Sequence, residues 1–271
     1  MEVGNPEGLV GLAEMRIEAG DWAGAERFAQ QAADAGELGG LNYMARKLAE
    51  AGDWGIAERF AQQAVSPGSA NALSVLAEMR AEAGNWEEAE RFAQQAADAG
   101  NLNGLLDLAE MRLKEGDREE AERLFHQAAE AGNPKGLAGL AEIQVMRKDW
   151  AGAERFAKQA ADAGGIDVLA YVVESRVNTG DLLGAERFAN KAAEDGEFEG
   201  LMRLAQMWAD AECHVKAEQA FQRAINIGSP GALEGLAELR AESPEDYERY
   251  ELDSEGALAE PWEWPEPRPR A

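Results

Sequence analysis

Cys213 and His214 are the neighbouring residues whose types could supply a nucleophile and its base. A thiol needs a positioned imidazole to become a thiolate, and the imidazole in turn needs a third group to orient it. Adjacent residues rarely present these two side chains to each other, and no orienting group is evident nearby. The equivalent place in a repeat described below carries Asp-Trp, so an altered turn also explains the pair. We predict no catalytic residue.

Other candidates for chemistry are few. His126 is far along the sequence from His214 and from the single cysteine, so no known zinc-ligand spacing can be composed. The sequence contains no glycine-rich phosphate loop of the G-x-G-x-x-G or Walker type. Carboxylates are plentiful, but a solvated surface explains them without catalysis. We therefore predict no metal site and no cofactor.

Acidic residues dominate the surface that this composition predicts. The sequence has 52 Asp and Glu against 26 Lys and Arg, a formal charge of −26. Such a surface repels phosphate backbones and anionic membranes, which argues against nucleic acid and membrane partners. It would attract a basic protein or peptide. Alternatively, the excess acid only keeps an elongated protein soluble.

The cellular compartment follows from simple features of the chain. Cys213 is the only cysteine, so no intrachain disulfide can form and a reducing compartment is natural. No apolar run approaches the length of a membrane span. The start, MEVGNPEG, has neither the basic region nor the apolar core of a signal peptide. We expect a cytoplasmic protein.

The most prominent feature is a repeat of 32 residues. EAGDWAGAERFAQQAADAG at residues 18–36 returns from Glu50 as EAGDWGIAERFAQQAVSPG and from Glu82 as EAGNWEEAERFAQQAADAG. Three columns, those of Ala25, Ala32 and Gly36, are filled by the same residue type in all seven units. The units run from Asn5 to Gly228, and a half unit follows from Ser229 to about Glu242.

Each unit predicts two helices joined by a turn. The turn pairs a glycine, which suits a left-handed helix end, with an Asp or Asn that caps the next helix, as in Gly20-Asp21. We expect capping boxes at Asn85 with Glu88 and at Asp117 with Glu120. The second helix carries Ala25 and Phe28 on one face. The predicted caps of the first helices are Asn5, Ser69, Asn101, Asn133 and Ser229.

The spacing of Leu9, Leu12 and Ala13, then Gly20-Asp21-Trp22, then Ala25 and Ala32 resembles the tetratricopeptide repeat. The ending AADAG, followed by Asn and Gly-Leu, resembles the related Sel1-like repeat. Since two short helices cannot bury their apolar faces alone, the units are expected to stack. We predict an all-α fold, a right-handed α-solenoid of seven and a half helix-turn-helix repeats over residues 1–242.

The units also depart from the tetratricopeptide pattern. They are shorter than the usual repeat, and most second helices carry their phenylalanine one position early, as Phe28 does. Only Phe125 and Phe221 lie where the pattern expects them. The pitch of the solenoid therefore stays open.

The resemblance implies that first helices line a concave groove that grips extended peptides or helices. Two columns just after the first leucine are the most varied part of the units, which indicates that packing does not dictate them. Drift at exposed positions is the alternative. Aromatic residues in these columns favour binding, because they are common contact anchors. The predicted peptide-binding residues from these columns are Asn42, Tyr43, Asp107, Tyr171 and Arg203.

One helical turn further lies a mostly acidic column. Like charges four residues apart destabilise a helix slightly, yet pairs such as Glu14 and Glu18 persist. A partner's cations could offset this repulsion. Relief by arginines, namely Arg16, Arg80, Arg112 and Arg176, is the alternative. We hypothesise an acidic concave groove for a basic, extended peptide, and the column contributes Arg46, Glu110, Glu142 and Glu174 to the predicted site.

Tryptophans recur at the turn, as Trp22, Trp54, Trp86 and Trp150. A stack of aromatic rings for a ligand is conceivable, but packing between repeats explains them better, since Arg118 and Leu182 replace them in other units.

The two ends raise further questions. Residues 243–271 break the repeat as an acidic tail rich in Pro and Trp, with a short capping helix expected near 244–252 and an extended segment after it. Trp262 and Trp264 could be a recognition motif or could fold back on the last helices. The first unit lacks an N-terminal cap, so the chain is either a piece of a longer protein or contacts something there, such as a second copy of itself.

Binding is the function that these observations favour. We predict a non-catalytic protein-protein interaction scaffold. A sensing or regulatory arm of a larger signalling protein is an alternative, as is a self-assembling module. An enzyme built on an α-solenoid would need convergent catalytic groups, which the sequence does not show.

Overall fold

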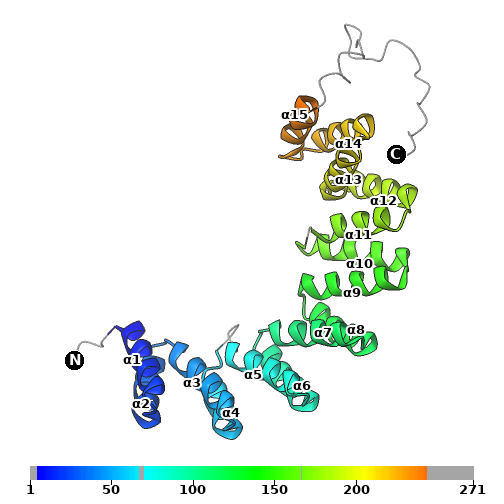
Figure 1. Ribbon diagram of the computed structural model, residues 1–271. Coiled ribbons are helices and arrows are strands. Elements are labelled where there is room, and N and C mark those ends of the chain that lie inside the picture. Colours follow the sequence, from blue (N-terminus) through cyan, green and yellow to red (C-terminus); the bar gives the residue numbers. More distant parts are fainter. Residues whose placement is uncertain (1–4, 67–69, 166, 243–271) are drawn as a thin grey trace, which may run out of the picture. The chain divides into compact units, whose positions relative to one another are not determined.

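The computed structural model describes residues 5–66, 70–165 and 167–242. These residues form fifteen α-helices (Figure 1). The predicted cap Ser69, the tail helix near 244–252, and Trp262 and Trp264 lie outside the described residues.

The helices alternate as the repeat predicts. The first helices are α1 (Pro6–Glu18), α3 (Gly39–Glu50), α5 (Asn71–Glu82), α7 (Asn103–Glu115), α9 (Pro134–Arg147), α11 (Asp167–Asn178), α13 (Glu199–Asp210) and α15 (Ala232–Glu242). The second helices are α2 (Trp22–Asp34), α4 (Trp54–Gln63), α6 (Trp86–Asp98), α8 (Arg118–Glu130), α10 (Trp150–Asp162), α12 (Leu182–Glu194) and α14 (His214–Asn226). The all-α helix-turn-helix prediction is confirmed.

Each turn closes one helix and opens the next with the same residues. Gly20 has a φ of 75° and donates its N–H to the Ile17 carbonyl at 2.9 Å. Asp21 donates its N–H to the Arg16 carbonyl at 2.8 Å, which completes the left-handed helix end. The Asp21 carboxylate then accepts the Gly24 N–H at 2.9 Å and caps α2. The predicted glycine stop and aspartate cap are therefore confirmed at this turn.

The cap residue at such a turn bonds the preceding helix through its backbone N–H and the next helix through its side chain, and this explains why the predicted capping boxes are incomplete. A box needs the backbone N–H of the cap residue, but Asn85 donates that N–H to the Arg80 carbonyl at 2.8 Å. The Glu88 carboxylate instead accepts from the Asn85 side-chain amide at 2.9 Å. Asp117 likewise donates its N–H to the preceding helix, at the Arg112 carbonyl.

One predicted first-helix cap is wrong, and another acts from one residue before the cap position. The Asn101 side chain accepts the N–H of Asn103, the first residue of α7, at 3.0 Å, although Leu102 is the cap residue. Asn101 is buried, and its amide also donates to Asn71 Oδ1 at 2.9 Å. The Ser229 hydroxyl is buried without a hydrogen-bond partner, and α15 begins at Ala232. Asn5 and Asn133 cap α1 and α9 as predicted.

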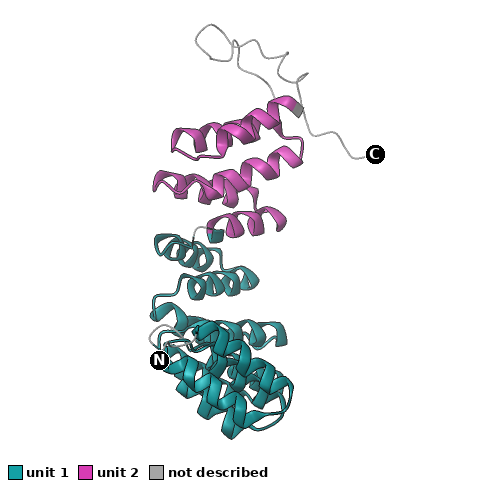
Figure 2. Ribbon diagram, turned by 90° about the vertical axis from the view of Figure 1, so that its left-hand side faces the viewer, with its two compact units in different colours: residues 1–168 teal, residues 169–271 magenta. Residues whose placement is uncertain are grey.

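The chain divides into two compact units, Met1–Val168 and Leu169–Ala271 (Figure 2). In the first unit, each of the first helices α1 to α9 packs against its own second helix, and those from α3 onward also pack against the second helix of the preceding repeat. Successive first helices also contact one another, from α1 to α9. Successive second helices make no contact of comparable extent within the part of this unit that the structure describes. The first helices therefore lie on the inner side of this unit (Figure 1).

Small residues allow this close stacking. Ala25 and Ala32 are fully buried, as are most of their equivalents in the other units. A Cβ added to Gly40 would lie 3.1 Å from the Ala29 backbone, so α3 approaches α2 more closely than a larger side chain would permit. Phe60 and Phe92 are almost completely buried as well. The copied segment is thus a packing helix.

Candidate functional site

Three carboxylates on the first helices of the first unit influence one another. Asp107 and Glu110 lie on α7, and Glu142 lies on α9. We call these three residues the acidic cluster. Burial, and then the Glu110 charge, raise the pKa of Asp107, although Lys135 and Lys114 act in the opposite direction. Burial, and then Glu110, also raise the pKa of Glu142. The cluster thus holds negative charge that a cation would stabilise.

The second unit holds a different arrangement of predicted residues. Glu174 of α11 and Arg203 of α13 form a two-pronged ion pair, with Arg203 Nη2 at 2.7 Å and Nε at 3.0 Å from the two carboxylate oxygens. The hydrogen bond to Glu174 raises the pKa of Arg203. These two predicted binding residues therefore neutralise each other. Tyr171, one turn before Glu174, is exposed.

In α3, the predicted residues are partly occupied by their own helix. The Tyr43 ring lies 5.2 Å from the Arg46 guanidinium carbon and 5.8 Å from Lys47 Nζ. Lys47 also donates to Glu50 at 2.6 Å, and this hydrogen bond raises its pKa. Tyr43 therefore presents an aromatic surface flanked by two cations. In the neighbouring position, Asn42 Oδ1 is buried without a hydrogen-bond partner.

Packing dictates the residue type at two glycines of the two varied columns, contrary to the prediction that packing leaves these columns free. A Cβ on Gly139 would lie 2.4 Å from the Phe125 ring, and a Cβ on Gly235 would lie 2.6 Å from the Phe221 ring. Glycine is required at both places because the ring occupies the space of a side chain. The column of Asn42 also lies partly against the next first helix, since a Cβ on Gly39 would contact the Val10 side chain at 3.4 Å.

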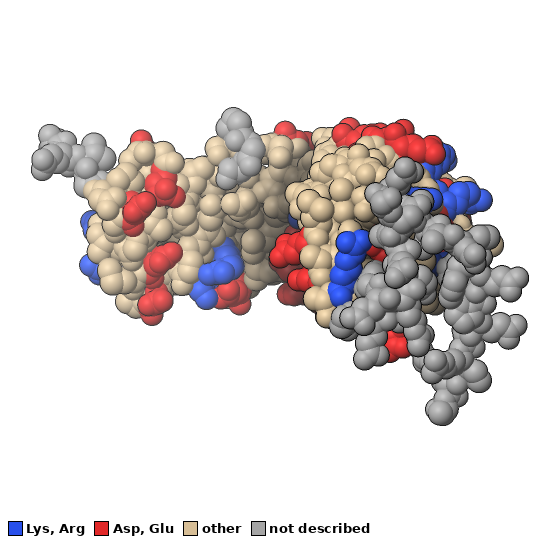
Figure 3. Space-filling view, turned by 90° about the horizontal axis from the view of Figure 1, so that it is seen from above, with Lys and Arg blue, Asp and Glu red and all other residues tan. Residues whose placement is uncertain are grey.

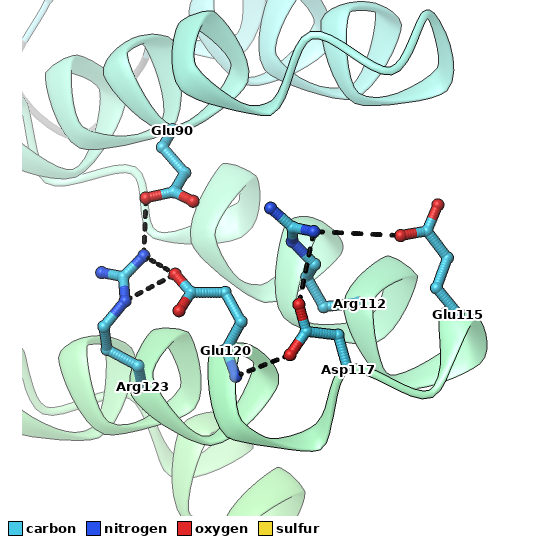
Figure 4. Close-up of polar contacts among 6 residues, drawn as sticks. All are labelled: Glu90, Arg112, Glu115, Asp117, Glu120 and Arg123. Atoms are coloured by element: carbon cyan, nitrogen blue, oxygen red, sulfur yellow. Dashed lines mark hydrogen bonds and ion pairs between the residues drawn. The ribbon is translucent and has the colours of Figure 1, made fainter.

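The arginines that could have relieved the acidic column are engaged at the turns. Arg16 pairs with Asp21 at 3.2 Å, and Arg80 pairs with Glu88 at 2.7 Å. Arg112 pairs with Asp117 at 3.4 Å (Figure 4). These contacts bind carboxylates outside the acidic column. The alternative explanation for that column is therefore weakened.

Two of these arginines, Arg80 and Arg112, also stack on tryptophans at the turns. The Arg80 guanidinium lies 3.7 Å from the centre of the Trp54 ring, and Arg112 lies 3.7 Å from the centre of the Trp86 ring. In both cases the arginine belongs to the repeat that follows the tryptophan. Packing between repeats, rather than a stack of rings for a ligand, accounts for Trp54 and Trp86.

Sequence reasoning missed a ladder of ion pairs along the second helices. Arg91 of α6 binds Glu58 of α4 at 2.5 Å, and Arg123 of α8 binds Glu90 of α6 at 2.5 Å. Arg123 also bonds Glu120 of its own helix, so it bridges two repeats (Figure 4). The signal was present as a Glu-Arg pair that recurs in six units. The ladder joins neighbouring repeats.

Charged side chains are distributed unevenly. On the face shown in Figure 3, small groups of acidic and basic side chains, several of them side by side, lie on a mostly uncharged surface. The acidic surface expected from composition is therefore not continuous on this face.

The residues considered for catalysis lie at an ordinary helix start. Cys213 is the cap residue of α14, and His214 is the first residue of that helix, as an altered turn predicts. Within residues 5–66, 70–165 and 167–242, no group of three or more His, Cys, Asp or Glu side chains could hold a metal ion. No helix in these ranges is long and apolar enough to cross a membrane.

Comparison with family models identifies the repeat. One tetratricopeptide repeat model matches residues 105–136, and a second matches residues 6–31 and 70–95. A comparison with curated proteins found no match. The likeness of the unit ends to Sel1-like repeats stays a resemblance.

Proposed function

Because the chain contains tetratricopeptide repeats, we propose that it is a non-catalytic interaction module for a basic, extended segment of a partner protein. Such repeats are generally protein-binding modules. The segment would lie along the inner side of the first unit, where the first helices contact one another.

The acidic cluster is the observation that carries this proposal. Each carboxylate of Asp107 and Glu142 is harder to ionise than usual because of burial and the Glu110 charge. Arginine or lysine side chains of a partner would reverse that penalty by supplying the opposite charge. Charge-assisted hydrogen bonds to a carboxylate are also stronger than neutral ones.

Residues of α3 would extend this binding surface. Asn42 Oδ1 is buried and lacks a donor, so its side chain would have to move to accept a backbone N–H from an extended segment. Tyr43 offers an aromatic contact, the kind that often anchors an interface. Arg46 beside it would exchange its long ion pair with Glu50, at 3.8 Å, for an acidic residue of the partner.

In the second unit, the predicted contacts are weaker. Glu174 and Arg203 would have to exchange their mutual ion pair for contacts with the partner. Tyr171 is exposed and would provide an aromatic contact. The first unit is therefore the principal binding region in this proposal.

A labelled peptide of alternating arginine and alanine tests the proposal. The double variant Glu110→Gln and Glu142→Gln should bind it about tenfold more weakly, a loss of about 1.4 kcal/mol. The matched control is Glu119→Gln with Glu130→Gln, which removes the same charge from exposed positions on α8. Fluorescence anisotropy measures both.

Salt and peptide charge complete the test. Binding through the cluster should weaken with added salt, since exposed charges are screened. A glutamate-alanine peptide should not bind. Equal affinities for the cluster variant and the α8 control would contradict the proposal. The regulatory-arm and cytoplasmic predictions stay predictions.

A further inference from the structure

The two internal junctions made by α4 and α6 share three contacts. In the junction made by α6, Trp86 stacks on Arg112 of α7 at 3.7 Å, and Glu90 binds Arg123 of α8 at 2.5 Å. Leu108 of α7 is fully buried there. The two contacting residues of α6 are four positions apart and so lie on one side of that helix.

The preceding junction repeats these contacts. Trp54 of α4 stacks on Arg80 at 3.7 Å, and Glu58 of α4 binds Arg91 at 2.5 Å. Leu76 is fully buried. A second helix with an aromatic residue and a glutamate four positions later thus covers each of these repeats.

The first repeat presents the same positions uncovered. Leu12, the equivalent of Leu76 and Leu108, is 38% exposed, whereas its equivalents are 0% exposed. The side chain of Arg16 is 51% exposed, against 17% for Arg80 and Arg112. Arg27, the equivalent of Arg91 and Arg123, has no carboxylate partner from another helix among the described residues. We call Leu12, Arg16 and Arg27 the first-repeat face.

Both arginines of this face already stand in the geometry of a covered junction. Arg16 is held by Asp21 at 3.2 Å, as Arg112 is held by Asp117 at 3.4 Å. Arg27 lies 5.1 Å from the centre of its neighbouring Phe28 ring, as other ladder arginines lie over theirs. A preorganised face loses little side-chain entropy when it binds a partner.

We infer that the first-repeat face is a docking site for an amphipathic helix of a partner protein, one with an aromatic residue, a glutamate four positions later and small residues beyond. The aromatic ring stacks on Arg16, the glutamate pairs with Arg27, and the small residues pack near Leu12. The inference extends the junction seen at α4 and α6 to the first repeat, and it concerns a surface other than the acidic cluster.

A second copy of the chain is a less suitable occupant. The second helices α2, α4, α6, α8, α12 and α14 each pack against the first helix that follows them. A copy that offered one of these helices would first have to open that contact. A second copy is therefore disfavoured as the occupant of this face.

The chain's own residues 85–100, NWEEAERFAQQAADAG, provide the probe, because they contain the helix that covers the fourth repeat. We expect the labelled peptide to bind the full chain at one saturable site. Arg27→Glu should weaken binding about tenfold, which corresponds to about 1.4 kcal/mol. A peptide with Glu90→Arg should restore affinity for that variant, since the charges are exchanged. A peptide with Trp86→Ala should bind more weakly to the unaltered chain.

Arg59→Glu is the matched control, because it makes the same charge change at an internal junction. It should leave peptide affinity unchanged. Equal affinity for the unaltered chain and for Arg27→Glu would overturn the inference. A dimer in sedimentation experiments that Arg27→Glu dissociates would also overturn it, since a second copy would then be the occupant.

A short peptide pays the cost of forming a helix, so a grafted chain provides a second measurement. Residues 86–100 are placed before Asn5 instead of residues 1–4, which preserves the repeat register at the glycine. The urea unfolding midpoint of the grafted chain should rise. It should rise less when the graft carries Trp86→Ala and Glu90→Ala, and an equal rise for both grafts would contradict the inferred contacts.

Discussion

The Phe125 ring of α8 occupies the space that a side chain at Gly139 of α9 would need, since a Cβ on Gly139 would lie 2.4 Å from Phe125 Cε1. Phe221 and Gly235 repeat the relationship at the last junction. Where the preceding second helix has alanine instead of this phenylalanine, the next first helix has a larger residue: Tyr43, Val75, Asp107, Tyr171 or Arg203. Part of the variation in this column therefore reflects packing between repeats.

Gly139→Ala should destabilise the chain by about 1–3 kcal/mol, because the added methyl group overlaps the Phe125 ring. The cost should be much smaller in a Phe125→Ala background, where the ring is removed. A double-mutant cycle from urea unfolding measures this coupling.

Gly11→Ala is the control for this cycle. Nothing lies within 4 Å of a Cβ added there, so the substitution should stabilise α1 by up to about 1 kcal/mol through helix propensity. If Gly139→Ala stabilised the chain as much as Gly11→Ala does, the predicted overlap between the added methyl group and the Phe125 ring would be contradicted.

Lys148 adopts the left-handed conformation, with φ of 59°, at the position where Gly116 closes α7 with φ of 89°. A side chain is unfavourable there, so Lys148→Gly should raise the free energy of unfolding by about 0.5–1 kcal/mol. Thermal or urea unfolding measures the gain. Gly116→Lys makes the reverse change at the equivalent turn and should destabilise the chain by a similar amount. A loss of stability in Lys148→Gly would contradict this account.

The fold could be predicted from the sequence because its determinants are local and repeated. Glycines such as Gly20 and caps such as Asp21 act through bonds to residues within five positions. The burial of Ala25 follows from a column that never varies between units. Local rules therefore located the helices and turns.

Contacts between repeats could not be predicted in the same way. The predicted cap failed at Ser229, whose hydroxyl is buried without a hydrogen-bond partner. The partners of Arg80 and Arg112 depend on how one repeat lies on the next. A signal for the Phe125 contact did exist, since Phe125 and Phe221 are each followed fourteen residues later by glycine. Asp107, Glu110 and Glu142 are each predicted from their columns, but the influence of Glu110 on the other two depends on how α7 and α9 pack.

Arg112 and Arg16 occupy equivalent positions, but only Arg112 has a tryptophan beneath it in the described structure. Arg112→Gln should cost about 1–2 kcal/mol, because its stacking on Trp86 and its ion pair with Asp117 are both lost. Arg16→Gln should cost at most about 0.5 kcal/mol, since it breaks only an exposed ion pair. Urea unfolding compares the two variants. Equal losses would show that stacking on the tryptophan adds nothing.

The acidic cluster predicts an unusual dependence of stability on pH. In the folded chain the pKa of Glu142 is raised above its ordinary 4.5, first by burial and then by Glu110. Between these two values the folded state binds more protons than the unfolded state, so stability falls as pH rises through that window. Glu142→Gln removes the penalty. At neutral pH this variant should gain about 0.5 kcal/mol, and the gain should shrink as pH falls below the ordinary pKa.

Glu58→Gln should behave in the opposite way. The hydrogen bond from Arg91 lowers the pKa of Glu58, so this carboxylate stabilises the fold above its ordinary pKa of 4.5 and loses that effect as pH falls through its lowered folded value. The variant should therefore lose up to about 1 kcal/mol at neutral pH, and the loss should disappear in acid. Urea titrations from acid to neutral pH measure both variants. If Glu142→Gln were less stable than the unaltered chain at neutral pH, the cluster would not be under electrostatic strain, and its proposed role as a cation-binding surface would lose its basis.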